Sequence, residues 1–203
     1  MEYPMVNSAF CLHLPCTQNP ESMRKIIFSA AISIDGYMEG PNGETDWCIM
    51  DEDMQFNVFL DETDTILFGR KCYDKYLKNG PPSTSKMDKE LWDTIFSKQL
   101  IVFSRTLTSV NNSIHLVREN MITAMTSLKA QPGRNIWLFG GASLASSMLN
   151  AGLIDEIQLG VIPIILGAGN PLFTGIEQRI LLKTSHSKLF KSGVQQLYLE
   201  PVK

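Results

Sequence analysis

The chain has 203 residues, of which 44% are hydrophobic and 19% are charged. This is sufficient for one globular domain with a hydrophobic core, and we predict a single domain over 23–203. The net charge of -3 supplies no overall positive field, which argues against a nucleic-acid partner. An anionic ligand would therefore need a local basic pocket.

Cysteine and histidine are too scattered to predict a metal site. The 4 cysteines form no C-x-x-C pair and the 3 histidines show no ligand spacing, so we expect neither a metal centre nor zinc deaminase chemistry. Unpaired cysteines favour a reducing compartment, and we expect a cytoplasmic protein. No apolar run reaches the ~18 residues that span a membrane. Residues 1–22 are polar and without periodicity, which predicts a poorly ordered arm, or a true start at Met23, rather than a secretory signal.

Hydrophobic patterning predicts alternating strands and helices along most of the chain. In chain order, we expect a strand at 25–33, a turn-rich loop, a helix at 51–60, a strand at 65–68, helices at 71–77 and 86–97, strands at 100–103 and 114–117, a helix at 120–130, a strand at 136–139 and a helix at 143–151. Asn79-Gly80-Pro81-Pro82 is a strong signal for the end of the helix at 71–77.

After residue 154 the pattern changes to strands. Ile157, Leu159 and Val161 alternate with polar or small residues, which indicates a strand with one wetter face. Two more strands, at 179–190 and 194–200, flank a short polar turn and predict a hairpin. The succession of elements is typical of an α/β fold with a mainly parallel sheet and an antiparallel edge at its C-terminal end.

Three distant segments share one pattern, an apolar strand that stops at a small or basic residue. They are Leu67-Phe68-Gly69-Arg70-Lys71, Val102-Phe103-Ser104-Arg105-Thr106 and Leu138-Phe139-Gly140-Gly141-Ala142-Ser143. Open α/β sheets bind ligands beyond the carboxyl ends of their strands, where helix N-termini, Arg and Lys attract phosphate. Gly69 has no Cβ and permits a close approach to a pyrophosphate. The pattern predicts a nicotinamide-dinucleotide site.

Six segments occur in a familiar order: Ser33-Ile34-Asp35-Gly36, Thr45-Asp46-Trp47, Phe68-Gly69-Arg70, Phe103-Ser104-Arg105-Thr106, Phe139-Gly140-Gly141 and the stretch from Ala151 to Phe173. Together they resemble the dihydrofolate reductase superfamily, and most of all the reductase domain of the bifunctional riboflavin-biosynthesis protein and its stand-alone relatives. The resemblance covers Arg24 to Val202. It implies a three-layer fold with helices on both faces of the sheet, an NADPH cofactor and a homodimer.

The resemblance also implies a set of cofactor contacts. An unusual backbone geometry is expected at Gly140-Gly141, the nicotinamide carboxamide docks at the end of the first strand, and a guanidinium with hydroxyls at the adenosine ribose favours NADP over NAD. The predicted cofactor-binding residues are Ala30, Ala31, Gly69, Arg70, Lys71, Ser104, Arg105, Thr106, Gly140, Gly141, Ala142, Ser143 and Leu144.

On the substrate side, Trp47, Phe56 and Ile162 are the predicted contacts. Glu52 follows Trp47 by five positions, where folate-specific reductases carry an acid. It would bind a pterin- or pyrimidine-like ring and relay a proton. The alternative is that Glu52 only belongs to an acidic cluster favoured by a helix start. Asp35 is the second candidate acid.

Three positions depart from the patterns of these enzymes. Ser29 and Tyr37 stand where the riboflavin type carries basic residues, and Gly160 stands where folate-specific reductases carry Thr. These differences weaken the case for a substrate that carries a ribose phosphate. We expect hydride transfer to a small heterocyclic or ribosylamino substrate, most like 5-amino-6-(5-phosphoribosylamino)uracil. Dihydrofolate or pterin reduction is the runner-up, and an NADPH-binding module without turnover or a structural dimer partner with a vestigial site are the rivals.

Overall fold

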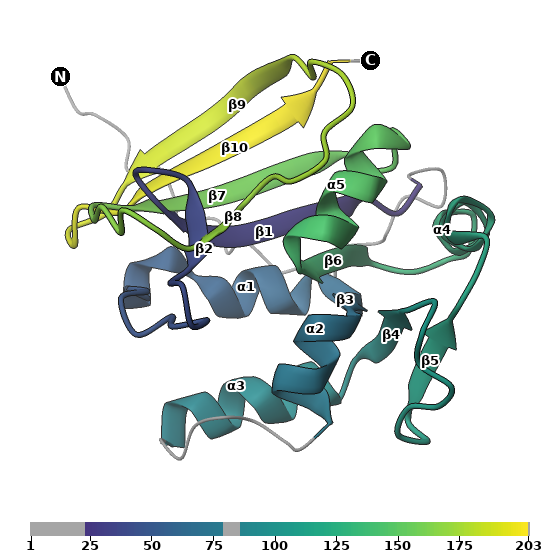
Figure 1. Cartoon of the computed structure of the whole chain (residues 1–203). Helices are drawn as coiled ribbons and strands as arrows, with labels where there is room; N and C mark the ends of the chain where they lie inside the picture. Colours follow the sequence, from purple (N-terminus) through teal and green to yellow (C-terminus); the bar gives the residue numbers. More distant parts are fainter. Residues whose placement is uncertain (1–22, 79–85, 203) are drawn as a thin grey trace, which may run out of the picture.

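The computed structural model describes residues 23–78 and 86–202, and its centre is one eight-stranded sheet (Figure 1). The strand order is β5-β4-β3-β6-β1-β7-β10-β9. All neighbours from β5 to β7 are parallel, whereas β10 is antiparallel to both β7 and β9. The strands are β1 (Ile26–Ser33), β3 (Thr63–Gly69), β4 (Gln99–Phe103), β5 (Ile114–Val117), β6 (Asn135–Gly140), β7 (Glu156–Ile162), β9 (Leu182–Leu189) and β10 (Gln195–Pro201). The predicted parallel sheet with an antiparallel edge hairpin is confirmed.

Helices cover both faces of the sheet. One face packs against α4 and α5, and the other packs against α1, η2 and α3 (Figure 1). The helices are the 3₁₀ turn η1 (Glu52–Met54), α1 (Phe56–Asp61), α2 (Arg70–Cys72), the π-helical η2 (Tyr73–Leu77), α3 (Lys86–Phe96), α4 (Met121–Lys129) and α5 (Ala142–Asn150). The predicted arm at 1–22 and the helix stop at 79–82 lie outside the described residues.

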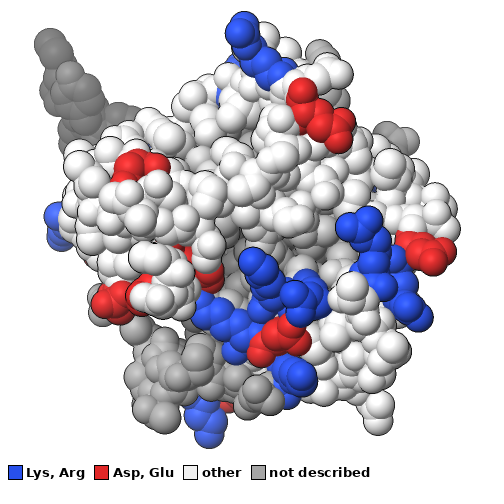
Figure 2. Space-filling model, viewed as in Figure 1, with Lys and Arg blue, Asp and Glu red and all other residues white. Residues whose placement is uncertain are grey.

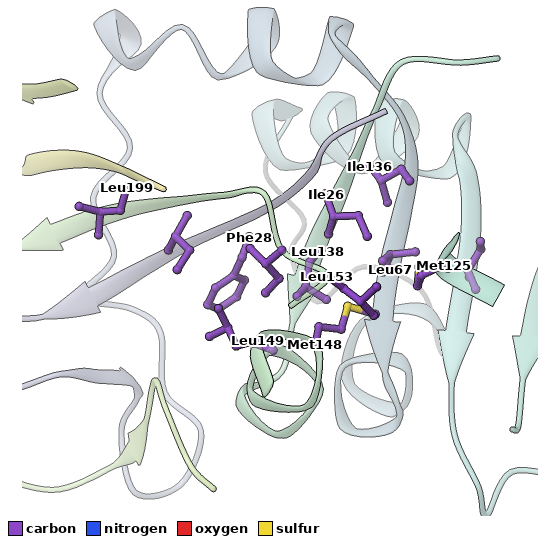
Figure 3. Packing of buried hydrophobic residues seen from close by; sticks show 14 of the residues in the cluster. Ile26, Phe28, Leu67, Met125, Ile136, Leu138, Met148, Leu149, Leu153 and Leu199 are labelled. Atoms are coloured by element: carbon purple, nitrogen blue, oxygen red, sulfur yellow. The ribbon is translucent and has the colours of Figure 1, made fainter. Parts of the chain in front are cut away.

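Strand alternation divides the core into two layers. In β3, Leu67 points to the α4–α5 side, and Ile66 and Phe68 point to the α1–α3 side. The first layer contains Phe28 of β1 and Met148 of α5 (Figure 3), and both are fully buried. Because successive side chains of a strand point to opposite faces, strands that are apolar at nearly every position are those covered on both sides.

The predicted helix at 51–60 is interrupted. Gln55 has a left-handed backbone conformation, with φ 52° and ψ 40°, so η1 ends before it and α1 begins at Phe56. The break sets Phe56 and Phe59 against Trp137 of β6, with ring centroids 5.5 and 5.4 Å apart. Tertiary packing of these rings therefore decides where α1 begins, which helical spacing alone did not indicate.

Two short strands form where only loops were predicted. β2 (Tyr37–Glu39) pairs antiparallel with β8 (Asn170–Pro171), although more than 130 residues of chain separate Glu39 from Asn170. Leu172 also donates its N–H to the carbonyl of Gly36, at 2.9 Å. These short strands lack the apolar alternation that marks a strand in sequence.

The antiparallel edge ends in an exposed strand. All residues of β9 are exposed, and β9 pairs only with β10 among the described strands. An open edge is where a second copy would pair, and the homodimer stays a prediction. Within 23–78 and 86–202, no helix has the length and apolar character needed to cross a membrane.

Candidate active site

A cleft of about 1350 Å³ lies at the carboxyl ends of the parallel strands. The parallel register aligns these ends, with Phe68 beside both Val102 and Gly140. Three segments far apart in sequence therefore converge on one cavity. The predicted residues that line it are Ala30, Ala31, Phe56, Gly69, Arg70, Lys71, Ser104, Arg105, Thr106, Gly141, Ala142, Ser143, Leu144 and Ile162.

Glycines bring two strand ends into close contact at the cleft wall. A Cβ on Gly69 would lie 3.3 Å from the Gly141 nitrogen and 3.4 Å from the Gly140 oxygen, so the ends of β3 and β6 touch through backbone atoms. Gly140 is buried behind this wall, has φ 137° and precedes a cis peptide bond to Gly141. Side chains on these glycines would keep the backbone away from a ligand.

Helix α5 begins directly after these glycines. Its first carbonyl acceptor is Gly141, which receives the N–H groups of Leu144 and Ala145 at 3.0 and 3.1 Å. The earlier N–H groups, on Ala142 and Ser143, have no carbonyl of the helix to bind. Both residues line the cleft. An anionic group placed here would meet N–H donors and the positive end of the helix dipole.

Basic side chains surround this part of the cleft. Arg70 is exposed and pairs with Asp74, with Nη1 and Oδ2 3.1 Å apart. Lys71, Arg105 and Arg118 are exposed lining residues as well. Figure 2 shows Lys and Arg side chains gathered on the face that carries α2, α4 and β5. The chain has a net negative charge, so an anionic ligand would need a local basic pocket. These side chains form one.

Ser104 organises the turn after β4. Its hydroxyl accepts the N–H groups of Thr106 and Leu107 at 3.2 and 3.1 Å, and its own N–H donates to the Val117 carbonyl at 3.1 Å. The last bond joins the ends of β4 and β5, and so brings Arg118 to the same corner as Arg105. Sequence reasoning missed Arg118, although a basic residue directly after the strand at 114–117 repeats the pattern seen after β4.

A polar clamp joins β2 to η2 in the lining of the cleft. The Lys75 ammonium lies 2.8 Å from Glu39 Oε1 and donates to the Gly43 carbonyl at 2.9 Å. Asn170 of β8 donates to the other oxygen of Glu39 at 3.0 Å. The sequence carried no signal for this clamp, because its members come from three distant segments and do not share a motif.

Cys72 packs behind the paired glycines. Its sulfur lies 3.8 and 3.6 Å from where Cβ atoms on Gly140 and Gly141 would be. Burial raises the pKa of this thiol to about 12, so it stays protonated at neutral pH. We assign it a packing role and no nucleophilic one.

The other end of the cleft is built from β1, β7 and β10. Ala31 is the register partner of Gly160, which is in turn the partner of Gln196, so the three form one row across the sheet. Phe56 and Trp137 form a wall beside this row. Ile162 lines the same region, and its predicted contact with substrate stays a prediction. Ala31 and Gly160 are small and leave room above this part of the sheet.

Trp47 does not line the cleft. It packs with Ile162, Phe190 and Val194 in a separate small cluster, and its indole N–H donates to the Glu44 carbonyl at 3.1 Å. Ile162 and Val194 of this cluster also line the cleft. A direct substrate contact by Trp47 is therefore not favoured by the geometry.

The two predicted acids differ in position. Asp35 is exposed and outside the cleft lining, and its carboxylate accepts the N–H groups of Leu166 and Gly167 at 3.2 and 2.8 Å. Hydrogen bonds from the Ser33 hydroxyl and these backbone groups lower the pKa of Asp35. An acid held in its charged form is a poor proton donor, so we assign Asp35 to loop anchoring. Glu52 lies in η1, and its side chain is outside the described residues.

The lowered pKa of Asp35 predicts a pH-dependent contribution to stability. The folded pKa is below the unfolded value, so the stabilisation is complete above the unfolded pKa and disappears as the pH falls through the folded pKa. We expect Asp35→Asn to lower the Tm at neutral pH and to match the wild type in strong acid. Asp46→Asn, an exposed carboxylate in the next loop, is the control. A Tm difference for Asp35→Asn that persists in acid would contradict the assignment.

With this geometry established, comparison with known proteins identifies the family. The RibD C-terminal domain matches residues 24–196. The chain belongs to the RibD C-terminal domain family. The uncharacterized protein YyaP of Bacillus subtilis (strain 168) is 46% identical over 183 residues, which are 88% of this chain and 96% of YyaP.

Solved structures agree on the fold. A putative riboflavin biosynthesis protein from Shewanella sp. PV-4 has a TM-score of 0.72 and 24% identity, over 88% of this chain and 99% of that one. Dihydrofolate reductase from Enterococcus faecalis, complexed with NADP(H), has a TM-score of 0.60 and 11% identity, over 88% and 97% of the two chains. The RibD C-terminal domain described here therefore has the dihydrofolate reductase-like fold, and its family indicates a reductase.

Proposed function

We propose that this protein is an NADPH-dependent reductase that acts on a small heterocyclic or ribosylamino substrate. The observation that supports it most is the convergence of Gly69, Gly141 and Arg105 on one cleft. The cleft has backbone N–H donors at the start of α5 and a basic rim, which suit a pyrophosphate and a further phosphate. Its volume of about 1350 Å³ accommodates a dinucleotide together with a second ligand.

Different residues of the chain would bind the cofactor, supply a proton and exclude water. Ala142 and Ser143 would hold the pyrophosphate through N–H groups, and Arg105 and Arg118 would bind the phosphate on the adenosine ribose. Bound NADPH supplies a hydride for the carbon of a C=N or C=O bond. The nitrogen or oxygen of that bond takes a proton from water or from Glu52, which stays a prediction. Phe56 and Trp137 would exclude water from the acceptor.

Two named activities fit the proposal. Reduction of 5-amino-6-(5-phosphoribosylamino)uracil agrees with the RibD C-terminal domain family, and a putative riboflavin biosynthesis protein shares the fold. Reduction of a dihydrofolate- or pterin-type ring is the second candidate. The observation that favours it is Ser29, an uncharged lining residue at the position where riboflavin-type reductases carry Lys.

Cofactor binding is the decisive test. We expect NADPH at 100 times its Kd to stabilise the protein by roughly 2.7 kcal/mol, and to be oxidised when the proper acceptor is added. Arg105→Ala and Arg118→Ala should each weaken NADPH binding by about 10-fold, because each removes a charge-assisted hydrogen bond, and should change NADH binding far less. Titration calorimetry with both coenzymes measures the effect.

Arg179→Ala is the matched control, since Arg179 is exposed and lines a different, smaller hollow. It removes the same charge and should leave both coenzyme affinities unchanged. Equal losses for NADPH and NADH would place the two arginines away from the extra phosphate. If NADPH produces no stabilisation at all, the reductase proposal fails. Tight NADPH binding without oxidation by uracil- or pterin-type acceptors would favour the non-catalytic binding module.

A further inference from the structure

The two ends of the cleft differ in charge. The end formed by β3, β4 and β5 carries Arg70, Lys71, Arg105 and Arg118. At the other end, the described side chains on β1, α1, β6, β7 and β10 are all uncharged. They are Ser29, Ala30, Ala31, Phe56, Trp137, Phe139, Gly160, Ile162 and Gln196. If the charged end holds the cofactor, the uncharged end is left for the acceptor.

Gln196 is the longest polar side chain of that end. Its Oε1 lies 3.4 Å from where a Cβ on Gly160 would be, so the carboxamide extends over Gly160 toward β1. Ala31 continues the row on the far side of Gly160. The floor is therefore flat and open, with one amide group at its edge.

This amide is not used within the fold. Among residues 23–78 and 86–202, neither the Gln196 carboxamide nor the Ser29 hydroxyl has a hydrogen-bond partner. A carboxamide offers one carbonyl acceptor and an NH₂ donor side by side. That pair matches the –CO–NH– edge of a cyclic amide, which presents an acceptor and a donor at the same spacing. The aromatic rings of Phe56 and Trp137, with centroids 5.5 Å apart, form an apolar wall next to it.

The cation nearest to Gln196 along the sheet, Lys188, interacts with groups outside the cleft. Lys188 of β9 is the register partner of Gln196. Its ammonium donates to the Asp53 carbonyl at 2.9 Å and lies 4.4 Å from the centre of the Phe190 ring. Lys188 is also outside the cleft lining. Lys75 also lines the cleft, but its ammonium is paired with Glu39. A phosphate on the acceptor would thus meet no unpaired cation among the described residues of this end.

We propose that Gln196 selects the acceptor, and that the acceptor is a flat, uncharged heterocycle with a cyclic –CO–NH– edge and no phosphate group. This choice favours a pterin-type ring over the phosphoribosylamino substrate. The Gln196 NH₂ donates to the ring carbonyl and its carbonyl oxygen accepts the ring N–H. Gly160 provides the open floor beneath the ring. The inference rests on the proposed function, because it assigns the charged end of the cleft to the cofactor.

Calorimetry on the NADPH-saturated protein tests this with lumazine, a neutral pteridine with cyclic –CO–NH– edges, and 1,3-dimethyllumazine, which lacks the ring N–H groups. We expect lumazine to bind at least about 10-fold more tightly, the effect of a paired hydrogen bond in a partly buried site. Gln196→Leu should reduce lumazine binding to the level of the methylated ring and leave NADPH affinity unchanged. Gln195→Leu, on the same strand but exposed and outside the lining, should behave as the wild type.

A second pair of probes tests the missing phosphate. Uridine should bind at least as tightly as uridine 5′-phosphate. The proposal is overturned if lumazine does not bind, if the two lumazines bind equally, if Gln196→Leu keeps the preference, or if the phosphate tightens binding. A protein that binds NADPH but shows one of these results retains the proposed function. Failure to bind NADPH in the same calorimeter overturns the reductase proposal itself.

Discussion

Gly140→Ala is expected to lower NADPH affinity by about 100-fold. Gly140 has φ 137°, a backbone conformation that costs residues with a Cβ about 1–3 kcal/mol. The added methyl would be in ordinary van der Waals contact with Cys72 and Met38, each at 3.8 Å, so the backbone relaxes because of its own dihedral rather than a clash. That relaxation moves Gly141 and the first N–H groups of α5, and displacements of about 1 Å can cost 10²-fold in a positioned site. Fluorescence titration with NADPH measures the loss.

Gly152→Ala is the control for this variant. Gly152 also has a positive φ, of 64°, with nothing within 4 Å of the added Cβ, but it lies at the opposite end of α5. It should cost about 1 kcal/mol of stability and leave NADPH affinity unchanged. If Gly140→Ala binds NADPH as the wild type does, the Gly140-Gly141 corner does not hold the cofactor.

Arg24→Met is expected to destabilise the fold by about 3 kcal/mol, which lowers Tm by roughly 6–12 °C in a domain of this size. Arg24 is 5% exposed and makes an ion pair with Asp64. Its guanidinium also donates to the Arg134 carbonyl and to the Thr65 hydroxyl, each at 2.7 Å. These contacts join the start of β1 to β3 and to the loop before β6. Removing one partner leaves the others without their hydrogen bonds.

Calorimetric melting of Arg24→Met is best compared with Lys25→Met. Lys25 is the neighbouring residue and pairs with Glu156, but its side chain is 53% exposed and the two charged atoms are 3.6 Å apart. Its loss should change stability by at most about 0.5 kcal/mol. Adding Asp64→Asn to Arg24→Met should restore part of the loss, because the unpaired carboxylate is removed. Equal Tm values for the Arg24 and Lys25 variants would show that the buried contacts contribute little.

The cofactor end of the cleft was predictable because its signals are local. A strand that stops at Gly69 or at Ser104 is visible in sequence, and parallel strands must place such ends at one edge of the sheet. The same rule applied to the strand before Arg118 would have added that residue. Asp35 and Trp47 were less predictable, since a motif names a residue without showing which way its side chain points. Asp35 turns to the backbone of Leu166 and Gly167, and Trp47 packs against the cluster that contains Ile162.

By itself, the amino-acid sequence determined the order of strands and helices, the parallel sheet with its antiparallel edge and the glycine and basic residues of the cofactor end. These features follow from periodicity and from backbone preferences that act over a few residues. Only the tertiary structure decided the β2–β8 pairing, the Lys75–Glu39 clamp and the row from Ala31 through Gly160 to Gln196. Each of these depends on contacts between segments far apart in the chain, and which distant polar groups meet is set by how the layers pack.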